Sequence, residues 1–449
     1  MFFALLGAIL LAGCGGNGDT TSQTTFNNGS GDQPFKPTTH LSHRALVTNF
    51  YSSNLDVVDT TEFKLTTFTF AIGDQPTYMQ PSPDGTLTLV NNTGSNSISS
   101  FNNNLEAVKA TIGLTGYTES FVTSVNNKVG FAAVPNYSNG SFRVPGAIVR
   151  FNPTDGSLNT QIQFPNVLYL GMDPAEKHLV AFTQSDYVPY WVDLSTLDPN
   201  TQVPPYYKIA LSDSSGNPVL LSRPVSVFFS ANTAYVLSCG PECGGSDPAS
   251  VTAIDLTTIA APATPTTGVT ITAKVLNVWQ VNGARQGLLD TKANKLYVAG
   301  STTTSTAIDC PFADINNPTL CAANSGGNNV QDGYFTVIDL TAGTASAPIR
   351  IGNGAKHMIR SIKGVFWVGS TNCGIESCIS MVNPSGTTPA SVLSIAKGDA
   401  TGITLATNND FVYTIEGGEL FIYDKNNNPF VSQYNTDVKG QASDILYID

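Results

Sequence analysis

A short motif recurs along most of this chain: an apolar, strand-like run that ends in Asp or Asn. The motif ends at eight positions, which are Asp59, Asn102, Asn152, Asp193, Asp255, Asp339, Asn383 and Asp424. Four of the seven spacings between these positions lie between 41 and 44 residues, and the others are longer. An Asp or Asn side chain accepts hydrogen bonds from the backbone two residues further on, and so starts a tight turn. The pattern indicates one repeated unit with insertions, rather than the two or three domains that the length would suggest.

Each motif belongs to a set of four short strands. A further apolar run precedes the motif, another follows it and often ends in Gly, and a fourth runs into a turn rich in Gly, Asn or Asp. No convincing amphipathic helix interrupts this pattern between residues 44 and 449. One four-stranded unit cannot bury both of its faces alone, whereas a closed ring of units can. We therefore predict an all-β fold, a single β-propeller over residues 44–449.

The first unit resembles the YVTN-type propeller repeat of lactonase-like proteins. The resemblance rests on Leu46-Val47-Thr48-Asn49, Val57-Val58-Asp59, Ile72-Gly73 and Ser82-Pro83-Asp84-Gly85. It is sharp in the first unit and loose in the third to fifth. Propellers of this family more often have seven blades. The eight units favour eight blades, and seven is the alternative if one unit elaborates its neighbour. We expect the last run, residues 443–448, to complete or flank the blade that begins at Arg44, which leaves no open sheet edge between the chain ends.

The N-terminal segment carries a different signal. Residues 2–11 form an apolar run that is too short to span a bilayer but typical of a signal-peptide core. They lead into Leu11-Ala12-Gly13-Cys14, which resembles the lipobox of bacterial lipoproteins, although no Lys or Arg precedes the run. The resemblance implies cleavage before Cys14 and lipidation of that cysteine, and Gly15 in place of Asp implies the outer membrane. The alternative is an ordinary signal peptide with an incidental cysteine.

The predicted organisation therefore has three parts. Residues 1–13 are a lipoprotein signal peptide, and residues 14–43 are the lipidated cysteine and a flexible linker rich in Gly, Asn, Thr and Ser. Residues 44–449 are the propeller. The mature chain is expected at the cell envelope, where the lipid is its only contact with the membrane.

The cysteine count agrees with an anchored protein in an oxidising compartment. Seven cysteines are an odd number, and a lipidated Cys14 leaves six. The six lie in insertions between predicted second and third strands, as Cys239 and Cys243, Cys310 and Cys321, and Cys373 and Cys378. We expect each loop to close its own disulfide, which either stiffens the loop for recognition or protects it from proteolysis. A zinc site is disfavoured, because these spacings lack the paired Cys-x2-Cys or His pattern.

Basic residues gather in the predicted connections from one blade to the next, which lead into the innermost strands. The candidate ligand-binding residues are Arg223, Arg285, His357, Arg360, Lys397 and Lys439, with Lys356 beside His357. A basic channel mouth on a chain of net charge −12 would concentrate anions or carboxylates. The alternative is a scatter of charges whose aliphatic stems pack at turns.

The sequence supplies little catalytic machinery. It has four His residues and no Gly-x-Ser-x-Gly, His-Glu-x-x-His or phosphate-binding loop motif. Only His357 is well placed near a channel, and no partner for it can be assigned, so the catalytic residues stay unknown. No cofactor and no metal site are expected, although Asp309, Asp314 and Asn316 offer a weak set of Ca²⁺ ligands.

Two functions fit these features. The favoured one is an envelope-anchored, monomeric binding or scaffold module that presents stapled loops to a protein, a glycan or an anionic small ligand. The alternative, which rests on the family resemblance, is a lactonase-like hydrolase or lyase with its site at the channel mouth. A nucleic-acid partner is excluded by the acidic balance of the chain.

Overall fold

The computed structural model describes residues 39, 41–135, 137–139, 142–144, 146–164, 166–183, 187–195, 204–260, 267–302, 333–361, 363–371, 378–385, 390–393, 398–406, 410–424, 432–436, 438 and 440–448. By its internal contacts the chain divides into Met1–Lys36 and Pro37–Asp449, and all described residues belong to the second unit. Its elements are β-strands and two short 3-10 helices, η1 (Gly240–Cys243) and η2 (Leu256–Thr258). Within these ranges, no helix is long and apolar enough to cross a membrane.

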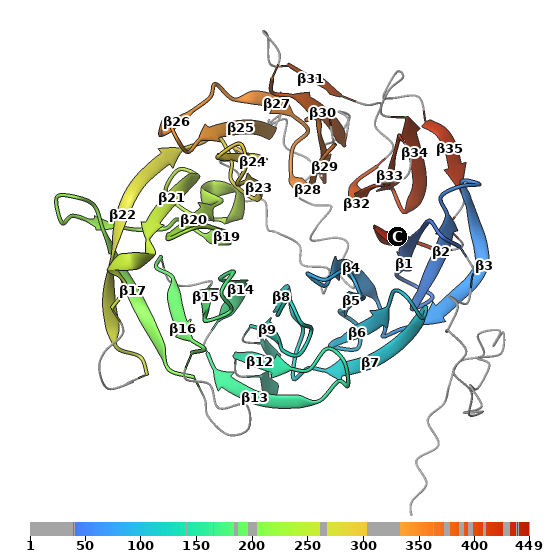
Figure 1. Ribbon diagram of the computed structural model, residues 1–449, viewed down its shortest axis with the longest axis horizontal. Coiled ribbons are helices and arrows are strands. Elements are labelled where there is room, and N and C mark those ends of the chain that lie inside the picture. The colour runs from blue at the N-terminus through green and yellow to red at the C-terminus, as the bar shows by residue number, and fades with distance from the viewer. Residues whose placement is uncertain are drawn as a thin grey trace, which may run out of the picture. The chain divides into compact units, whose positions relative to one another are not determined.

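The described strands form eight antiparallel blades around a central opening (Figure 1), which confirms the all-β propeller and the favoured blade number. From the innermost strand outwards, blade 1 contains β36 (Ala442–Ile448), β1 (Arg44–Asn49), β2 (Asn54–Asp59) and β3 (Lys64–Ala71). Blade 2 contains β4 (Pro76–Pro81), β5 (Leu87–Asn92), β6 (Ser97–Asn102) and β7 (Ala107–Gly113). Blade 3 contains β8 (Ser120–Thr123), β9 (Gly130–Val134), β12 (Ala147–Phe151) and β13 (Leu158–Gln163).

The next two blades are joined into one sheet. Blade 4 contains β14 (Val167–Met172), β15 (His178–Thr183), β16 (Tyr190–Asp193) and β17 (Tyr206–Ser212), with β18 (Pro218–Val219) added to β17. Blade 5 contains β19 (Pro224–Ser230), β20 (Thr233–Ser238), β21 (Ser250–Asp255) and β22 (Thr270–Gln280). The outer strands β17 and β22 pair in parallel from Lys208↔Thr270 to Ser212↔Lys274. Each strand thereby covers the open edge of the other.

The remaining blades follow the simple pattern. Blade 6 contains β23 (Gln286–Asp290), β24 (Lys295–Ser301), β25 (Gly333–Asp339) and an outer strand in two pieces, β26 (Thr344–Ala345) and β27 (Ile349–Ile351). Blade 7 contains β28 (Ala355–Arg360), β29 (Phe366–Ser370), β30 (Ile379–Asn383) and β31 (Ala390–Leu393). Blade 8 contains β32 (Ala400–Leu405), β33 (Phe411–Glu416), β34 (Glu419–Asp424) and β35 (Ser432–Thr436).

The two chain ends close the ring within blade 1, as the sequence predicts. Strand β36 pairs with β1 from Arg44↔Ile448 to Asn49↔Ala442. It also binds the next blade, because Asp444 Oδ2 accepts a hydrogen bond of 2.6 Å from the backbone N–H of Met79. The C-terminal strand therefore joins blade 1 to blade 2 as well as completing blade 1.

The repeated Asx motif ends the third strand of each blade and starts the turn to the fourth. Asp255 Oδ1 accepts the backbone N–H of Thr257 at 2.9 Å, and Asp339 Oδ1 accepts that of Thr341 at 3.0 Å. The same contact occurs at Asp59, Asn102, Asn152, Asp193 and Asn383. The turn that follows Asp424 lies outside the described residues. These side chains are turn-formers, which accounts for the acids that look paired along the sequence.

The core lies between neighbouring blades. One cluster joins Phe131 and Ile148 of blade 3 to Leu170 and Ala181 of blade 4. Because each sheet face packs on another blade, middle strands such as β1 and β5 are buried at every residue. Polar residues of these strands, such as Thr48 and Asn92, are therefore buried together with the apolar ones.

Candidate functional site

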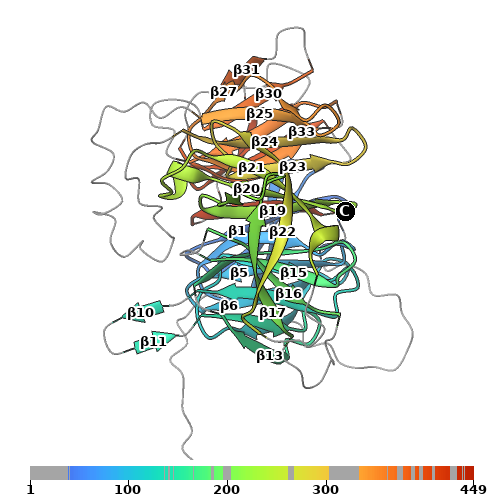
Figure 2. The same cartoon turned by 90° about the vertical axis from the view of Figure 1, so that its left-hand side faces the viewer.

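The strand ends that flank the predicted insertions lie at one face of the ring. The insertions join second to third strands at β9–β12, β20–β21, β24–β25 and β29–β30. In a four-stranded antiparallel blade, these loops share a face with the connections to the next blade. The hairpin of β10 (Tyr137–Asn139) and β11 (Phe142–Val144) projects on this side of the ring (Figure 2). We call this the insertion face.

One of the three expected local disulfides is present in the described residues. Cys239 and Cys243 are bonded across η1, with their Cα atoms 5.8 Å apart. Cys378 is also disulfide-bonded, to a partner outside the described residues. Cys310, Cys321 and Cys373 lie outside them too, as does Cys14, so their pairing and lipidation stay predictions.

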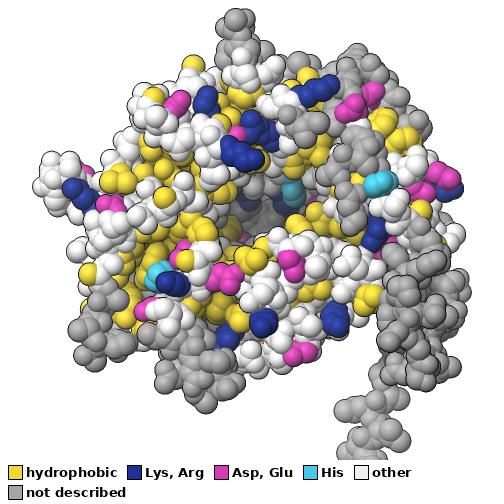
Figure 3. Space-filling view, viewed as in Figure 1, with side chains coloured by type: hydrophobic (Ala, Val, Ile, Leu, Met, Phe, Trp, Pro, Cys, Tyr) yellow, Lys and Arg dark blue, Asp and Glu magenta, His cyan; other side chains and the backbone are white. Residues whose placement is uncertain are grey.

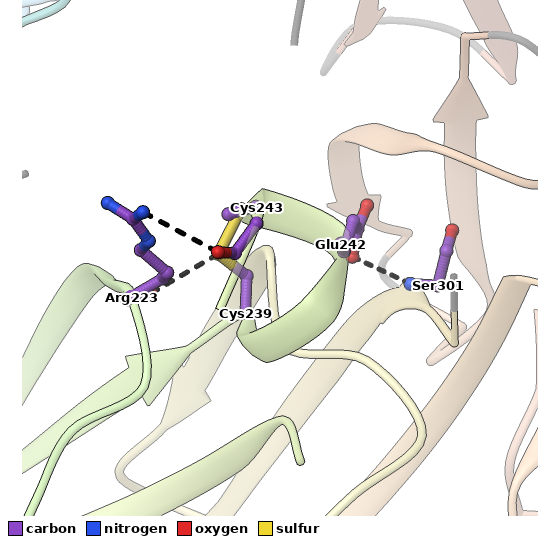
Figure 4. Close-up of a disulfide and its surroundings, with 6 residues drawn as sticks. Arg223, Cys239, Glu242, Cys243 and Ser301 are labelled. Atoms are coloured by element: carbon purple, nitrogen blue, oxygen red, sulfur yellow. Dashed lines mark hydrogen bonds between the residues drawn. A yellow bond between two sulfur atoms is a disulfide. The ribbon is translucent and has the colours of Figure 1, made fainter. Parts of the chain in front are cut away.

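Hydrogen bonds connect the loops of blades 5, 6 and 7 on the insertion face. The buried carboxylate of Glu242, between the bonded cysteines, accepts the backbone N–H of Ser301 at 2.7 Å (Figure 4). Ser301 Oγ in turn accepts the backbone N–H of Gly354 at 2.8 Å. The carbonyl of Gly354 accepts the backbone N–H of Thr371 at 2.8 Å, next to the loop that ends at Cys378. The described residues at the ends of β20, β24 and β29 are therefore linked by hydrogen bonds across the three blades.

Arg223 is the last residue before β19 and lies beside the disulfide. Its φ of +58° is in the left-handed region, which costs about 1–2 kcal/mol for a residue with a Cβ. The carbonyl of Arg223 accepts the backbone N–H of Cys239 at 3.0 Å. Its guanidinium donates to the carbonyl of Gly244 at 3.5 Å (Figure 4). The chain thus keeps a strained arginine at a position that glycine would occupy more easily.

Replacing Arg223 with Gly is expected to raise the free energy of unfolding by about 1 kcal/mol, because it removes this strain. Asn166→Gly is the matched control. Asn166 precedes β14 with a φ of +54°, a conformation that asparagine tolerates better, so the expected gain is smaller. Chemical denaturation measures both. A loss of stability in Arg223→Gly would show that the side-chain contacts outweigh the strain.

Six of the eight innermost strands have a β-bulge near their beginning on the insertion face. The pairing register shifts between Pro76 and Tyr78 in β4, and between Ala355 and His357 in β28. The same shift occurs in β14, β19, β32 and β36. In β36 it falls between Ala442 and Asp444, which pair with Asn49 and Thr48 of β1. A bulge leaves one residue unpaired and re-aims its side chain. In β28 the bulged residue is Lys356, which places a cation beside the central opening.

His357 follows Lys356 in β28, the innermost strand of blade 7, and is half-buried. We call the innermost strands around the central opening the channel wall. Burial, and secondarily the charge of Lys356, lower its pKa to about 3, although a backbone contact with Thr401 opposes this shift. Its Nε2 is shielded from solvent and has no hydrogen-bond partner among the described residues. A base with this pKa is uncharged at neutral pH and binds a proton too weakly for general-base catalysis. Histidine and Lys or Arg side chains are visible in the wall of the opening in Figure 3.

Two residues that the sequence analysis missed complete this wall. Burial raises the pKa of Asp444 to about 7, against the lowering effects of the Met79 and Ile445 N–H groups and of Lys356. Burial also raises the pKa of Tyr78, with further contributions from Glu119 and Asp444. Tyr78 and Asp444 directly follow the bulge of their strands, as His357 does. An alignment of the eight units on their innermost strands would have pointed to them.

His357 and Asp444 should give opposite pH dependences of stability. The pKa of His357 is lowered from 6.5 to about 3, so its contribution to stability is lost as the pH falls through this range. The pKa of Asp444 is raised from 3.8 to about 7, so its contribution is lost as the pH rises through that range. Relative to the wild type, the unfolding free energy of Asp444→Asn should therefore rise between pH 4 and pH 6.5, and that of His357→Gln should fall. Denaturant titrations at several pH values measure both, and parallel curves would contradict the assignment.

The other predicted site residues divide into three groups. Arg285 directly precedes β23 and its backbone N–H binds the carbonyl of Ala299 at 2.9 Å, at the insertion-face end of the strand. Arg360 ends β28 on the opposite side, where it pairs with Asp290 and lies 5.4 Å from the ring centre of Tyr297. The structure therefore does not bring Arg360 together with the other cations. Lys397 and Lys439 lie outside the described residues.

The sequence predicts no metal site apart from a weak set of Ca²⁺ ligands. No cluster of three or more His, Cys, Asp or Glu side chains suited to a metal ion occurs in the described ranges. Asp309, Asp314 and Asn316, the weak set of Ca²⁺ ligands, lie outside those ranges.

No protein-family model matches this chain. No curated protein matches it either. Solved structures do match: a dihydro-heme d1 dehydrogenase, NirN, is 12% identical with a TM-score of 0.63, over 92% of this chain and 77% of that one. The periplasmic gluconolactonase PpgL of Pseudomonas aeruginosa is 13% identical with a TM-score of 0.48, over 91% and 99%. BamB of Moraxella catarrhalis is 11% identical with a TM-score of 0.49, over 86% and 91%. At these identities the likeness is one of fold.

Proposed function

We propose that this chain is an envelope-anchored lipoprotein whose propeller binds an anionic ligand at the insertion-face end of the channel. One observation carries the proposal. Three consecutive blades, 5, 6 and 7, each place a cation at the start of the innermost strand, namely Arg223, Arg285 and Lys356. The strand ends that hydrogen bonds join together belong to the same three blades. Hydrogen-bonded strand ends beside several cations lower the ordering cost of binding a carboxylate or a phosphate.

A uronic-acid glycan tests this site, with trigalacturonate as the probe. Arg285→Gln and Lys356→Gln are each expected to weaken binding about tenfold, because each removes a charge-assisted contact. Lys128→Gln is the control, since Lys128 is exposed in the turn between β8 and β9, at the other end of the strands. Isothermal titration calorimetry at low and high salt measures the affinities. Equal affinities for all three variants, or no binding to the wild type, would contradict the proposal for this anion class.

Cys14→Ser tests the anchor separately. The variant is expected to leave the membrane fraction completely, because a single residue carries the lipid in this proposal. Fractionation followed by immunoblotting measures the change, and Cys239→Ser, which alters only a loop disulfide, should stay with the membrane. A Cys14→Ser protein that still sediments with membranes would refute the lipid anchor and the outer-membrane location that depends on it.

A lactonase-like hydrolase or lyase is the second candidate, because Asp444 has a pKa of about 7 within reach of Lys356 in the channel wall. Such a carboxyl group can accept a proton near neutral pH. His357 is not the base in this scheme, since its pKa is about 3. Turnover of δ-lactones that is lost in Asp444→Asn and kept in His357→Gln would favour the enzyme. No turnover by the wild type would leave the binding module as the better description.

A further inference from the structure

The channel wall of blades 5, 6 and 7 exposes apolar side chains. Strand β23 is half-buried at every residue, and β19 and β28 are half-buried at every residue but the first. These strands are the innermost of their blades, so the surface that they leave uncovered faces the central opening (Figure 3). Each strand ends in two apolar residues and one polar residue. We call the apolar pairs the apolar belt, which consists of Phe228, Phe229, Leu288, Leu289, Met358 and Ile359.

The belt occupies the same position in three consecutive blades. The first residue of each pair lies opposite the third residue of the second strand, as Phe228 with Tyr235, Leu288 with Tyr297 and Met358 with Val368. In the flanking blades 4 and 8 this position holds Gly171 and Thr404, which are both buried. Single exposed apolar residues are ordinary, whereas a contiguous apolar surface is typical of a binding groove. The belt is therefore a bounded patch on one side of the channel.

The belt and the cations of the proposed anion site belong to the same strands. Leu289 follows Arg285 by four residues, and Ile359 follows Lys356 by three. At about 3.3 Å per residue, the cations and the belt are separated by about 10–13 Å along each strand. One ligand of medium length can therefore contact both.

The charges at the two ends of the belt give such a ligand one orientation. At the far end, Arg360 forms an ion pair with Asp290, which neutralises its charge. At the insertion-face end, Arg285 and Lys356 bring positive charge to the wall without an acidic residue beside them in β23 or β28. A negatively charged end group is therefore favoured at the insertion face, with the apolar part of the ligand below it.

We propose that the ligand of this site is an amphiphilic carboxylate, with its carboxylate at the cations and a linear aliphatic chain on the apolar belt. The inference rests on the proposed function, because it assigns the ligand class of the same site. A methylene group that loses water on one side favours binding by about twofold, so the chain contributes affinity that a wholly polar anion does not gain. Affinity should therefore increase with chain length.

The probes are butanoate, octanoate and the uncharged octanamide, titrated into the full chain by calorimetry. Octanoate is expected to bind at least about tenfold more tightly than butanoate and than octanamide. Equal affinities for butanoate and octanoate, or binding of trigalacturonate without octanoate, would overturn this inference and leave the anion site intact. If neither octanoate nor trigalacturonate binds, the anion site is contradicted as well.

Two variants separate the aliphatic chain from the carboxylate. Met358→Gln keeps the length of the side chain but makes its end polar, so it should weaken octanoate binding about fivefold and leave butanoate binding unchanged. Met381→Gln is the matched control, since Met381 is a half-buried methionine of the same blade but lies in its third strand, β30. Unchanged octanoate affinity in Met358→Gln would refute the role of the belt.

Arg285→Gln tests the other end of the ligand. It should weaken the binding of octanoate and of butanoate by the same factor, about tenfold, because both acids carry the same carboxylate. If it weakened neither, the anion site itself would be wrong, whatever the effect of Met358→Gln. Thermal melting of each variant shows whether a loss of affinity comes from a loss of folding.

Discussion

Replacing Glu106 with Ala is expected to lower the free energy of unfolding by about 3–5 kcal/mol, because it leaves a buried guanidinium without its counter-charge. The Glu106 carboxylate lies 2.7 Å from Arg44 Nε, and the two side chains are 0% and 4% exposed. It also accepts two hydrogen bonds of 2.6 Å from Thr39, one from the backbone N–H and one from Oγ1. These contacts attach the beginning of the propeller to the outer turn of blade 2. Urea denaturation of the two proteins measures the difference.

Glu62→Ala is the control for this prediction. Glu62 pairs with Lys64 on the surface, where the two side chains are 58% and 61% exposed. Exposed ion pairs contribute little to stability, so this variant should unfold like the wild type. If Glu106→Ala lost no more stability than Glu62→Ala, the buried pair would have no structural importance.

Deleting residues 441–449 is expected to prevent formation of the closed ring. The deletion removes β36, and with it the pairing with β1 and the side-chain contacts of Ser443 and Asp444 with blade 2. It exposes the inner edge of blade 1 and opens the apolar cluster around Val47 and Ile445. An open edge of this kind favours aggregation. Limited proteolysis and near-UV circular dichroism measure the loss.

Asp444→Asn is a less disruptive change in the same strand. It removes the charge but keeps an acceptor for the Met79 N–H, so the ring should still close. A peptide that spans residues 440–449 should restore protease resistance to the truncated chain by pairing with β1. A truncated chain that is as protease-resistant as the wild type would show that the ring does not need its C-terminal strand.

The channel wall could be predicted from the sequence only in part. The sequence groups Arg360 with His357, because the two are three residues apart in a predicted connection. In the structure both belong to β28, and Lys356 and Arg360 lie about 13 Å apart along it at about 3.3 Å per residue. Arg360 therefore reaches the opposite face, where it pairs with Asp290. Strand boundaries, rather than residue type, decide which end of the channel a cation reaches.

The features that follow from the sequence alone are local ones. An Asp or Asn at a strand end makes its turn with the next few residues, so the turns at Asp255 and Asp339 follow from the sequence alone. The blade number, the closing strand at residues 442–448 and the Cys239–Cys243 disulfide follow from such short-range patterns. Each depends on a few neighbouring residues or on their regular recurrence.

The features that join distant segments depend on the packing of the blades. The parallel pairing of β17 with β22, the Asp444 contact to Met79 and the apolar belt all bring together residues from different blades. No local rule places these partners, because their distances depend on how whole blades pack around the ring. The pKa values of His357 and Asp444 belong to the same class, since burial by several strands shifts them most. The repeat thus determines the scaffold, and the packing of the blades determines its candidate sites.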